Sequence, residues 1–482
     1  MLTMLKRIFL LLTLFLLTLA IATSCSSGPK TSLTSPSSPV SPSNNSNNSP
    51  TPKLRIWWGQ GLIPEENAVI TKLIDDWEKL SGVDTEIVLM NDINIKGEVE
   101  KALAQGNPPD ILMTFTGDLN LYPRLTWDNQ LVDISDVIEP IKDDMIPAAL
   151  ESVRYRNNVT KKRSYYGVPL CQQELHVMFW RDLLEQADLK KEDIPQEWDK
   201  FWKFWQKAQD NLKAKGNNDI FGLGLSVSAV GTDNYSQFEH ILEAYNVKIV
   251  NEQGELVIDN PQAREGIIKA LKLLAGFQKD KYNPPEAINW GDSDNNFGFL
   301  TRRVVMVLNP TLSIPLSQKL PDNAYNKNPR DRYLNKIVTI KFPNKPDGTP
   351  MVYIPSVRQA VMFASSKKQE AGKKFLSFIV KPENLNVYLK EANKGRVFPV
   401  FKKEFAEPFW NNPEDPHLSV GAEQYRLPSR LLPTVYNPAY SQVAAQQVWG
   451  KALVSVIKDN LSPEQAADNA IAQIKEIFAK WK

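Results

Sequence analysis

The chain has 482 residues, of which 23% are charged and 42% are hydrophobic, and its formal net charge is +2. This length allows two or three domains with a large buried core, and the composition is ordinary for a globular protein. The near-neutral charge gives no electrostatic basis for binding nucleic acid, and no nucleic-acid partner is expected.

The first 25 residues have the layout of a secretory signal peptide. Lys6 and Arg7 precede the apolar run IFLLLTLFLLTLAIA, and small residues follow up to Cys25. An uncleaved signal anchor is the alternative, but the run is shorter than the ~20 residues that span a bilayer comfortably. The ATSC ending resembles a bacterial lipobox, with Ala22 in place of the commoner leucine. This predicts that Cys25 is lipidated, which would leave Cys171 without a disulfide partner and favour a buried, inert thiol.

Residues 26–52 are almost entirely Ser, Pro, Asn and Thr, so they cannot bury enough surface to fold and are expected to form a disordered tether. From residue 53 onward, strand and helix patterns alternate, which is typical of a parallel α/β sheet. The first expected elements are a strand at 54–58, a helix ending near Leu80 before Gly82, a strand at 85–90, a helix at 97–105 and a strand at 108–115.

The pattern continues through the rest of the chain. YYGVPL (165–170) leads to a helix expected from about Met178, and the helix at 197–213 carries a stripe of aromatic residues whose spacing favours a buried face over a sugar platform. Further elements are expected as a strand at 221–227, a helix at 258–277, strands at 304–310 and 358–366, and helices at 367–379 and 463–480.

The stretch WGDSDNNFGFL (290–300) places Asp292, Asp294 and Asn296 at every second position. A twelve-residue calcium loop counted from Asp292 would need glycine at the sixth position and glutamate at the twelfth, where Phe297 and Arg303 stand. The calcium interpretation therefore fails, and no zinc pattern or glycine-rich phosphate loop replaces it. Neither a metal nor a cofactor is expected.

Several stretches in the same order resemble the extracellular solute-binding proteins of bacterial carbohydrate ABC importers, the family that includes maltose-binding protein. They include ALAQGNPPDIL (102–112), YYGVPL (165–170), MFWRDLLEQADL (178–189), WDKFWKFWQKA (198–208), FLTRRVVMVLNP (299–310) and SSKKQEAGKKFLSFI (365–379). Each motif is weak alone, but their shared order covers roughly residues 53 to 400.

The resemblance implies the α/β, two-lobed periplasmic binding protein type 2 fold, with a hinge between the lobes and the ligand in the cleft. One lobe would hold residues 53–165 and part of 300–365. The other would hold 166–300 and the C-terminal helices of about 366–482. The resemblance also implies a monomer that delivers its solute to ABC permease subunits from the outer side of the membrane, with the lipid as anchor.

Carbohydrate offers hydroxyl groups around a ring with apolar faces, so amide, carboxylate, arginine and aromatic side chains suit it. In the family such residues come from strand ends and the loops that follow. The expected ligand contacts are Trp58, Gln60, Thr116, Asp118, Gln172, Gln173, Trp290, Asp292, Asn309 and Arg396.

Some of these residues have structural alternatives. Either Trp57 or Trp58 must face the core of an alternating strand, Asp118 could cap a helix, and only one of Gln172 and Gln173 need reach the ligand. Asp294 is expected to cap the helix that holds Phe297 and Leu300.

The expected function is capture of a mono- or oligosaccharide for an ABC importer, without catalysis. Two alternatives remain open at this point. One is a binder of another solute, such as a polyamine or a phosphorylated polyol. The other is a secreted glycoside hydrolase, which would need two carboxyl groups facing each other, for example Asp118 and Asp292. Serine hydrolase chemistry is disfavoured, because the chain has only three histidines and no GxSxG elbow.

Overall fold

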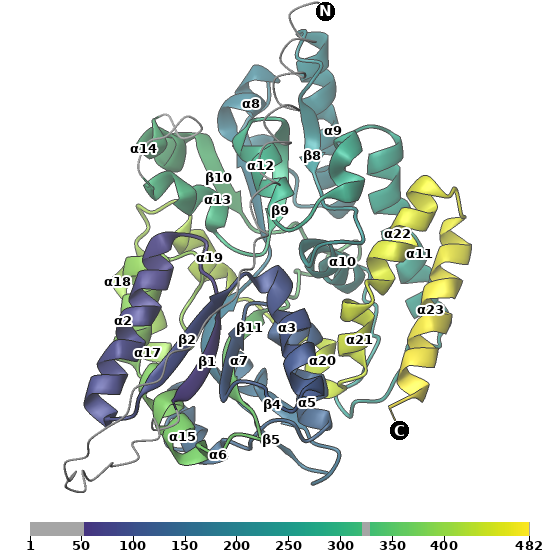
Figure 1. The fold of residues 1–482 in the computed structure, drawn as a ribbon. Helices are drawn as coiled ribbons and strands as arrows, with labels where there is room; N and C mark the ends of the chain where they lie inside the picture. The colour runs from purple at the N-terminus through teal and green to yellow at the C-terminus, as the bar shows by residue number, and fades with distance from the viewer. Residues whose placement is uncertain (1–52, 321–327, 482) are drawn as a thin grey trace, which may run out of the picture. The chain divides into compact units, whose positions relative to one another are not determined.

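The computed structural model describes residues 53–320 and 328–481. The signal peptide, the lipidated Cys25 and the tether that the sequence predicts lie outside these residues. The described residues form one unit that contains two large sheets. We call the five-stranded sheet with the helices that pack on it the first lobe, and the four-stranded sheet with its helices the second lobe (Figure 1).

The first lobe is built on a five-stranded sheet in the order β2-β1-β3-β11-β6. The pairs β1–β2 and β1–β3 are parallel, whereas β11 is antiparallel to both β3 and β6. The strands are β1 (Leu54–Gly59), β2 (Thr85–Met90), β3 (Ile111–Thr114), β6 (Gly167–Gln173) and β11 (Ser356–Met362).

The second lobe is built on a four-stranded sheet in the order β10-β7-β9-β8, and a separate two-stranded sheet pairs β4 with β5. Here β8 and β9 are parallel, and β7 is antiparallel to β9 and β10. The strands of the second lobe are β7 (His176–Trp180), β8 (Phe221–Gly224), β9 (Val304–Asn309) and β10 (Ile337–Ile340). The two-stranded sheet of β4 (Arg154–Arg156) and β5 (Arg163–Tyr165) packs against α5 (Tyr122–Trp127) and α6 (Ser135–Ile138) of the first lobe.

The longer helices largely follow the sequence patterns. Gly82 ends α2 in the left-handed conformation (φ 68°), and its N–H donates to the Glu78 carbonyl, as expected for a helix stop. Trp77 of α2 packs edge-on against Phe375 of α15 at 5.4 Å. These helices are α2 (Pro64–Ser81), α3 (Asp92–Ala104), α9 (Trp198–Ala214), α10 (Asp233–Ala244), α11 (Pro261–Lys279), α15 (Gln369–Ile379), α22 (Val448–Lys458) and α23 (Pro463–Ala479).

Short helices make most of the connections. They are α4 (Gly117–Asn120), α5 (Tyr122–Trp127), α6 (Ser135–Ile138), α7 (Pro147–Glu151), α8 (Arg181–Gln186), α12 (Asp294–Leu300), α13 (Ser313–Leu316), α14 (Pro329–Asp331), α16 (Pro382–Asn386), α17 (Lys402–Phe405), α18 (Pro408–Asn411), α19 (Leu418–Gln424), α20 (Pro433–Tyr436) and α21 (Tyr440–Ala445). Single turns of other helix types are η1 (Lys142–Asp144), η2 (Lys191–Asp193), η3 (Pro285–Asn289), η4 (Ser317–Lys319), η5 (Arg332–Lys336) and η6 (Val387–Ala392).

The aromatic stripe of α9 is core, as its spacing indicates. Trp198, Phe201, Trp202 and Trp205 are all buried, and they meet one another mostly edge to face. Cys171 is also buried, as expected, and burial raises the pKa of its thiol to about 11, which favours the protonated form at neutral pH.

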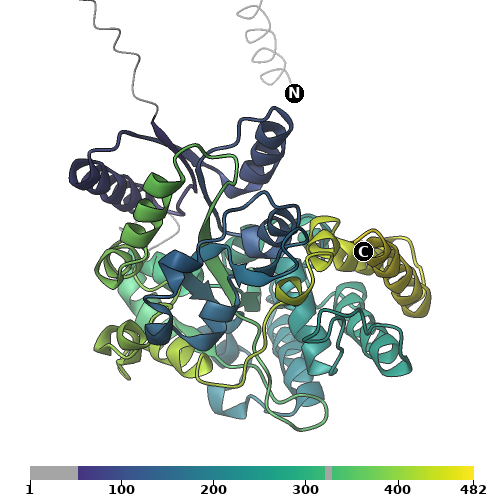
Figure 2. The ribbon, with the colours of Figure 1, turned by 90° about the horizontal axis from the view of Figure 1, so that it is seen from below.

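The chain divides between the lobes differently from the expected boundaries. β6 belongs to the first sheet, because it pairs along β11, and β9 and β10 belong to the second. The helix expected from Met178 begins only at Arg181, since HVMFW forms β7. Helix α15 packs on the first lobe, whereas α22 and α23 pack against α11, as the view from below also shows (Figure 2).

Candidate functional site

The carboxyl ends of the parallel strands in both sheets turn toward the region between the lobes. Only two residues, Glu174 and Leu175, separate the end of β6 in the first sheet from the start of β7 in the second. A solute held between two lobes would meet side chains at these strand ends. The expected site residues fall into a first-lobe group, a second-lobe group and a pair at Arg396.

The first-lobe group surrounds Asp92 and Arg358. The Asp92 carboxylate accepts from the Phe115 N–H at 2.7 Å and from the Thr116 hydroxyl at 3.1 Å, which ties the turn after β3 to the start of α3. The Arg358 guanidinium lies 4.1 Å from the centre of the Phe115 ring and donates to Gln173 at 3.1 Å.

Asp118 lies in the first turn of α4 and is 2% exposed. Its Oδ2 accepts from the Ser356 hydroxyl at 2.6 Å and from the Val357 N–H at 3.0 Å, where β11 begins. Its Oδ1 has no hydrogen-bond partner among the described residues. Burial raises the pKa of this carboxyl to about 6, and the two hydrogen bonds to β11 oppose that rise.

Three other first-lobe predictions have different surroundings. Trp58 is in the core, and Trp57, on the opposite face of β1, is only partly buried. Gln60 is exposed beyond the end of β1. Gln172 is buried and donates to the Pro399 carbonyl at 2.8 Å, so of the two neighbouring glutamines it is Gln173 that lies nearer the surface.

The second-lobe group gathers around the start of α10. Asp292 is exposed, and its two oxygens accept from the Thr232 N–H at 2.5 Å, the Thr232 hydroxyl at 3.0 Å and the Asp233 N–H at 2.9 Å. The carboxylate therefore satisfies the first N–H groups of α10 from a separate loop. Trp290 is largely buried, and its carbonyl accepts from the Ser228 hydroxyl at 2.5 Å.

The remaining predictions of this group also make internal bonds. Asn309 ends β9, donates to Asn296 and accepts from the Thr311 N–H at 3.1 Å. The Asp294 carboxylate accepts from the Gly291 N–H at 2.8 Å, and the residue lies inside the first turn of α12. The expected N-cap role of Asp294 is therefore wrong, because Ser293 occupies the cap position and makes no side-chain cap bond.

Arg396 connects elements of both lobes. It is buried and donates to Glu66 at 2.5 Å and to Asn393 at 2.8 Å, while its carbonyl accepts from Leu312, which follows β9. Both members of the ion pair are buried, so their charges compensate each other away from water.

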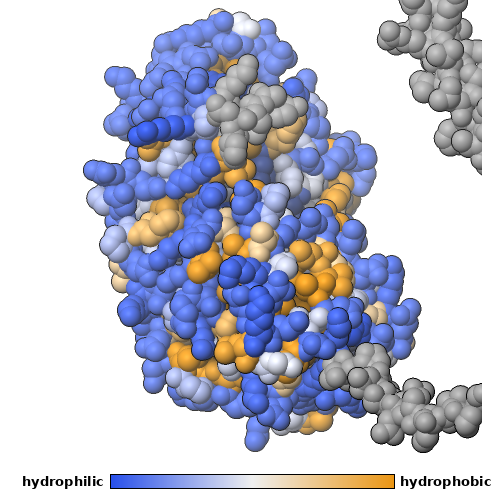
Figure 3. Space-filling model, turned by 60° about the vertical axis from the view of Figure 1, so that its left-hand side comes forward, coloured by the Kyte–Doolittle hydropathy of each residue, from blue (hydrophilic) through white to orange (hydrophobic). Residues whose placement is uncertain are grey.

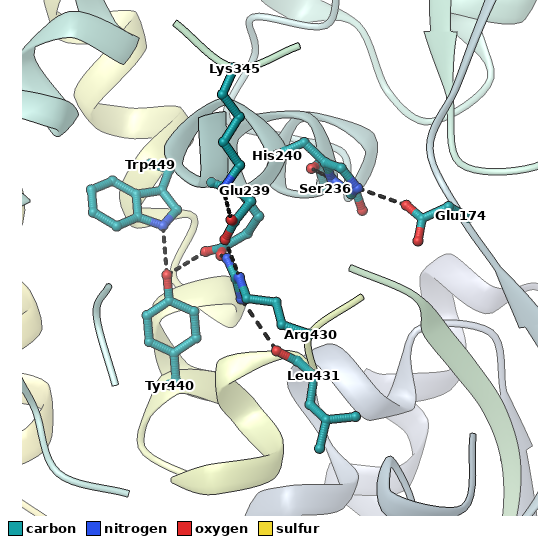
Figure 4. Close-up of polar contacts among 10 residues, drawn as sticks. Glu174, Ser236, Glu239, His240, Lys345, Arg430, Leu431, Tyr440 and Trp449 are labelled. Atoms are coloured by element: carbon teal, nitrogen blue, oxygen red, sulfur yellow. Dashed lines mark hydrogen bonds and ion pairs between the residues drawn. The ribbon is translucent and has the colours of Figure 1, made fainter. Parts of the chain in front are cut away.

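A further polar cluster, which the sequence patterns did not single out, lies on α10 and on the segments that face it (Figure 4). Glu239 accepts from the Tyr440 hydroxyl, which in turn accepts from Trp449 Nε1 at 3.0 Å. Arg430 lies 3.6 Å from Glu239 and 2.6 Å from Glu243, and Lys345 lies 2.5 Å from Glu243. The only available signal was the density of polar residues in DNYSQFEHILEA, whose helix turns out to be almost wholly buried.

Glu174, in the link between β6 and β7, contacts this cluster through His240 of α10. The Glu174 carboxylate lies 2.7 Å from His240 Nε2, and Glu174 lines a cavity of about 200 Å³ together with Gln172, Tyr353, Gln424 and Tyr425, among others. On the other side of the Tyr353–Ser429 backbone bridge, Glu243 and Arg430 line a larger cavity of about 450 Å³. Buried polar groups thus lie beside the link between β6 and β7.

The surface visible in Figure 3 is mostly hydrophilic, which does not suit a large apolar ligand. In the view of Figure 3, hydrophilic residues cover most of the face and hydrophobic ones form smaller patches between them. No helix in 53–320 or 328–481 is long and apolar enough to cross a membrane. Over the same residues, no group of three or more His, Cys, Asp or Glu is placed to hold a metal ion.

Two α/β lobes with polar residues gathered between them define a two-lobed binding protein. Residues 72–418 match the model of the bacterial extracellular solute-binding proteins, and the chain belongs to this family. Membership confirms the expected family and places the chain outside the cytoplasm. It also favours solute binding over the glycoside hydrolase considered from the sequence.

Solved structures of similar fold span nearly the whole chain. A solute-binding protein from Thermotoga lettingae with bound α-D-tagatose is 20% identical, with a TM-score of 0.71 over 89% of this chain and 100% of its own. A sugar transporter protein from Arthrobacter chlorophenolicus with laminaribiose is 16% identical (TM-score 0.67, 88% and 99%). A Listeria monocytogenes protein with cycloalternan is 17% identical (0.67, 89% and 99%). These likenesses confirm the two-lobed fold. Comparison with curated proteins finds no match.

Proposed function

We propose that this chain is the sugar-capturing component of an ABC importer. It holds a mono- or oligosaccharide between its lobes and delivers it to permease subunits in the membrane. Family membership carries the proposal, and the sugars in the names of the similar structures support it. The polar side chains between the lobes suit a hydroxylated ligand, because they combine carboxylates, amides and phenols.

Among the expected contacts, we favour those with hydrogen-bonding capacity to spare as direct ligand contacts. These are Gln60, Thr116, Asp118 and Gln173. Asp292 and Asn309 already use their polar atoms within the protein, and Arg396 is held in a buried ion pair with Glu66, so the proposed role of these residues is to hold the loops of the site in place. Trp290 remains a candidate stacking surface, with only a small part of its side chain exposed.

Calorimetric titration of the purified full-length protein in mild detergent tests the proposal. The ligand panel consists of neutral and amino mono-, di- and trisaccharides, polyols and a polyamine. We expect one-to-one binding of at least one sugar, with the sugar recovered intact. Binding of the polyamine or of a charged polyol alone would contradict sugar capture, and recovery of cleaved sugar would point to a hydrolase.

The anchor is a separate proposal. Lipidation of Cys25 would retain the protein at the membrane, with residues 26–52 as a tether to the folded part. We expect a Cys25→Ser variant to leave the membrane fraction, while a Cys171→Ser variant, altered at the buried thiol, remains there. Equal release of both variants, or of neither, would contradict the proposal.

A further inference from the structure

Three buried carboxylates lie where the two lobes face each other, and we call Asp118, Glu174 and Glu239 the acidic centre. Asp118 comes from the first lobe, Glu239 from α10 of the second, and Glu174 from the link between the sheets. All three are at most 2% exposed. Helix α10 and the helices that pack on it connect them. His240 of α10 bonds Glu174. Tyr440 of α21 bonds Glu239, and its ring lies 6.3 Å from that of Tyr235. Thr434 of the neighbouring α20 donates to the Asp118 carbonyl at 3.0 Å.

Each carboxylate of the acidic centre has one oxygen without a hydrogen-bond partner among the described residues. Oδ1 of Asp118, Oε2 of Glu174 and Oε2 of Glu239 make no hydrogen bond to any described residue, although each is shielded from solvent. The buried hydroxyl of Tyr235 also has no hydrogen-bond partner among the described residues. Most buried polar atoms of native proteins are hydrogen-bonded, so a concentration of such atoms between two lobes indicates a place for a hydrogen-bonding ligand.

Few cationic side chains among the described residues pair with the acidic centre. Lys345 and Arg430 both pair with Glu243, and only Arg430 also reaches Glu239, at the longer distance of 3.6 Å. Glu174 is hydrogen-bonded to His240 Nε2 at 2.7 Å, while Asp118 makes no ion pair with any described residue. Burial raises the pKa of the Asp118 carboxyl to about 6 against the lowering effect of its hydrogen bonds, and it also raises that of Glu239 against the lowering effect of Arg430.

Buried tyrosines lie near Asp118. The Tyr122 ring packs directly against Gly117, the residue before Asp118. Burial raises the pKa of the phenols of Tyr122, Tyr155 and Tyr235, and the Asp118 charge adds to each rise. A carboxylate among aromatic rings is a favourable environment for an ammonium group, which gains both an ion pair and interaction with the rings. A neutral sugar could donate hydroxyl hydrogens to the same oxygens but would leave the negative charge uncompensated.

From these contacts we infer that the solute is an amino sugar, a saccharide that carries a protonated amine, and that Asp118 is its counter-ion. The inference rests on the proposed function and narrows it to one class of sugar. The hydroxyl of Tyr235 and the acceptors on Glu174 and Glu239 serve the hydroxyl groups of the ring. A polyamine would satisfy the charge, but its ammonium groups offer no acceptor for the Tyr235 O–H.

Calorimetry with matched ligands tests this inference on the full-length protein at pH 7. Glucosamine, glucose and N-acetylglucosamine share one ring and differ in the group on one carbon, which is charged only in glucosamine. Their β-1,4-linked dimers extend the comparison. We expect the amine to bind at least about tenfold tighter than either neutral form of the same length. Lowering the pH from 7 to 5 should weaken binding of the amine more than that of the neutral sugars, because Asp118 becomes protonated.

An Asp118→Asn variant should lose about 30-fold or more in affinity for the amine and much less for the neutral sugars. Asp182→Asn is the matched control, since Asp182 pairs with Arg302 at the start of α8, beyond the end of β7 that lies farther from Glu174. Thermal unfolding checks that both variants fold, and the pH comparison on the unaltered protein decides the question if one does not.

The outcomes separate this inference from the proposed function. Equal or tighter binding of a neutral sugar overturns the amino-sugar inference and leaves sugar capture intact. Absence of binding by every member of the series also overturns the amino-sugar inference, while the wider sugar panel still decides sugar capture. Binding of putrescine without binding of any sugar overturns both.

Discussion

Two aspartates at the facing edges of the lobes are held in opposite ways. Asp292, in the second lobe, is exposed, yet its two oxygens receive three hydrogen bonds from Thr232 and Asp233. Asp118, in the first lobe, is buried, yet one of its oxygens has no hydrogen-bond partner among the described residues. The exposed carboxylate is thus engaged in fixing the start of a helix, and the buried one keeps capacity for something else. Exposure alone is a poor guide to which of two acids contacts a ligand.

The largest effect on stability is expected from removing the cation that pairs with another buried acid, Glu66. Glu66 is 1% exposed and depends on Arg396 for compensation. Arg396→Met should lower the free energy of unfolding by about 3–5 kcal/mol, because it leaves a buried carboxylate without its cation. Urea denaturation measures the loss.

Arg303→Met is the control for that change. Arg303 also pairs with a glutamate, Glu286, but both side chains are more than 40% exposed. Its loss should stay below about 1 kcal/mol. Similar losses for the two variants would mean that burial of Glu66 adds nothing, and the contrast between compensated and uncompensated acids would fail.

The next effect has the opposite sign. Asp118→Asn should stabilise the ligand-free protein at pH 7 by about 3 kcal/mol, since the pKa of this carboxyl is raised from 3.8 to about 6 and ionisation is disfavoured in the folded state. Between these pH values the native protein holds its proton more tightly than the unfolded chain does. The cost of the charge therefore develops as the pH rises from about 4 through 6, and the gain from the variant should vanish near pH 4.

Urea denaturation at pH 7 and at pH 4 checks the pH dependence. A variant that is less stable than the parent at pH 7, or whose effect is the same at both pH values, would contradict the interpretation of Asp118 as an uncompensated acid. Stabilisation together with loss of ligand affinity would show that this position favours binding at the expense of stability.

The smallest effect concerns Asp292. Asp292→Ala removes the acceptor for the first N–H groups of α10 and should cost about 1–2 kcal/mol, in the range of a lost helix cap. Asp294→Ala, two residues along the same loop, removes a single bond to Gly291 and should cost less than half as much. Thermal denaturation ranks the two variants, and equal losses would indicate that the contacts of Asp292 to Thr232 and Asp233 are weak in solution.

Much of the fold can be predicted from the sequence because local patterns determine it. TEIVLM gives β2 with the expected ends, the spacing of Ile70, Leu73, Ile74 and Trp77 gives the buried face of α2, and Gly82 ends that helix. The point where the chain passes between lobes has no local pattern. β6 pairs with β11, a strand that follows much later in the chain, so its assignment to the first sheet depends on a distant partner.

The candidate site is harder to predict for a related reason. Strand ends and turns mark Asp118 and Gln173 as polar residues near the lobe interface, but nothing in the sequence distinguishes Asp118 from Asp292. The difference lies in donors supplied by Ser356 and Thr232, which are far away in the chain. Glu239 is missed from the sequence because polar residues on α10 look like a solvated face, whereas other segments cover them. Arg430 and Tyr440 lie beyond residue 400, outside the stretch that the family resemblance covers.

The position of β11 also affects the order in which the protein can be completed during synthesis. This strand lies between β3 and β6 but leaves the ribosome only after every strand of the second sheet. Until then β3 and β6 have no strand between them, and the first sheet cannot close however early its other members appear. A nascent chain that must be exported before it folds gains time from this arrangement, because its largest sheet stays incomplete until about three-quarters of the polypeptide has been made.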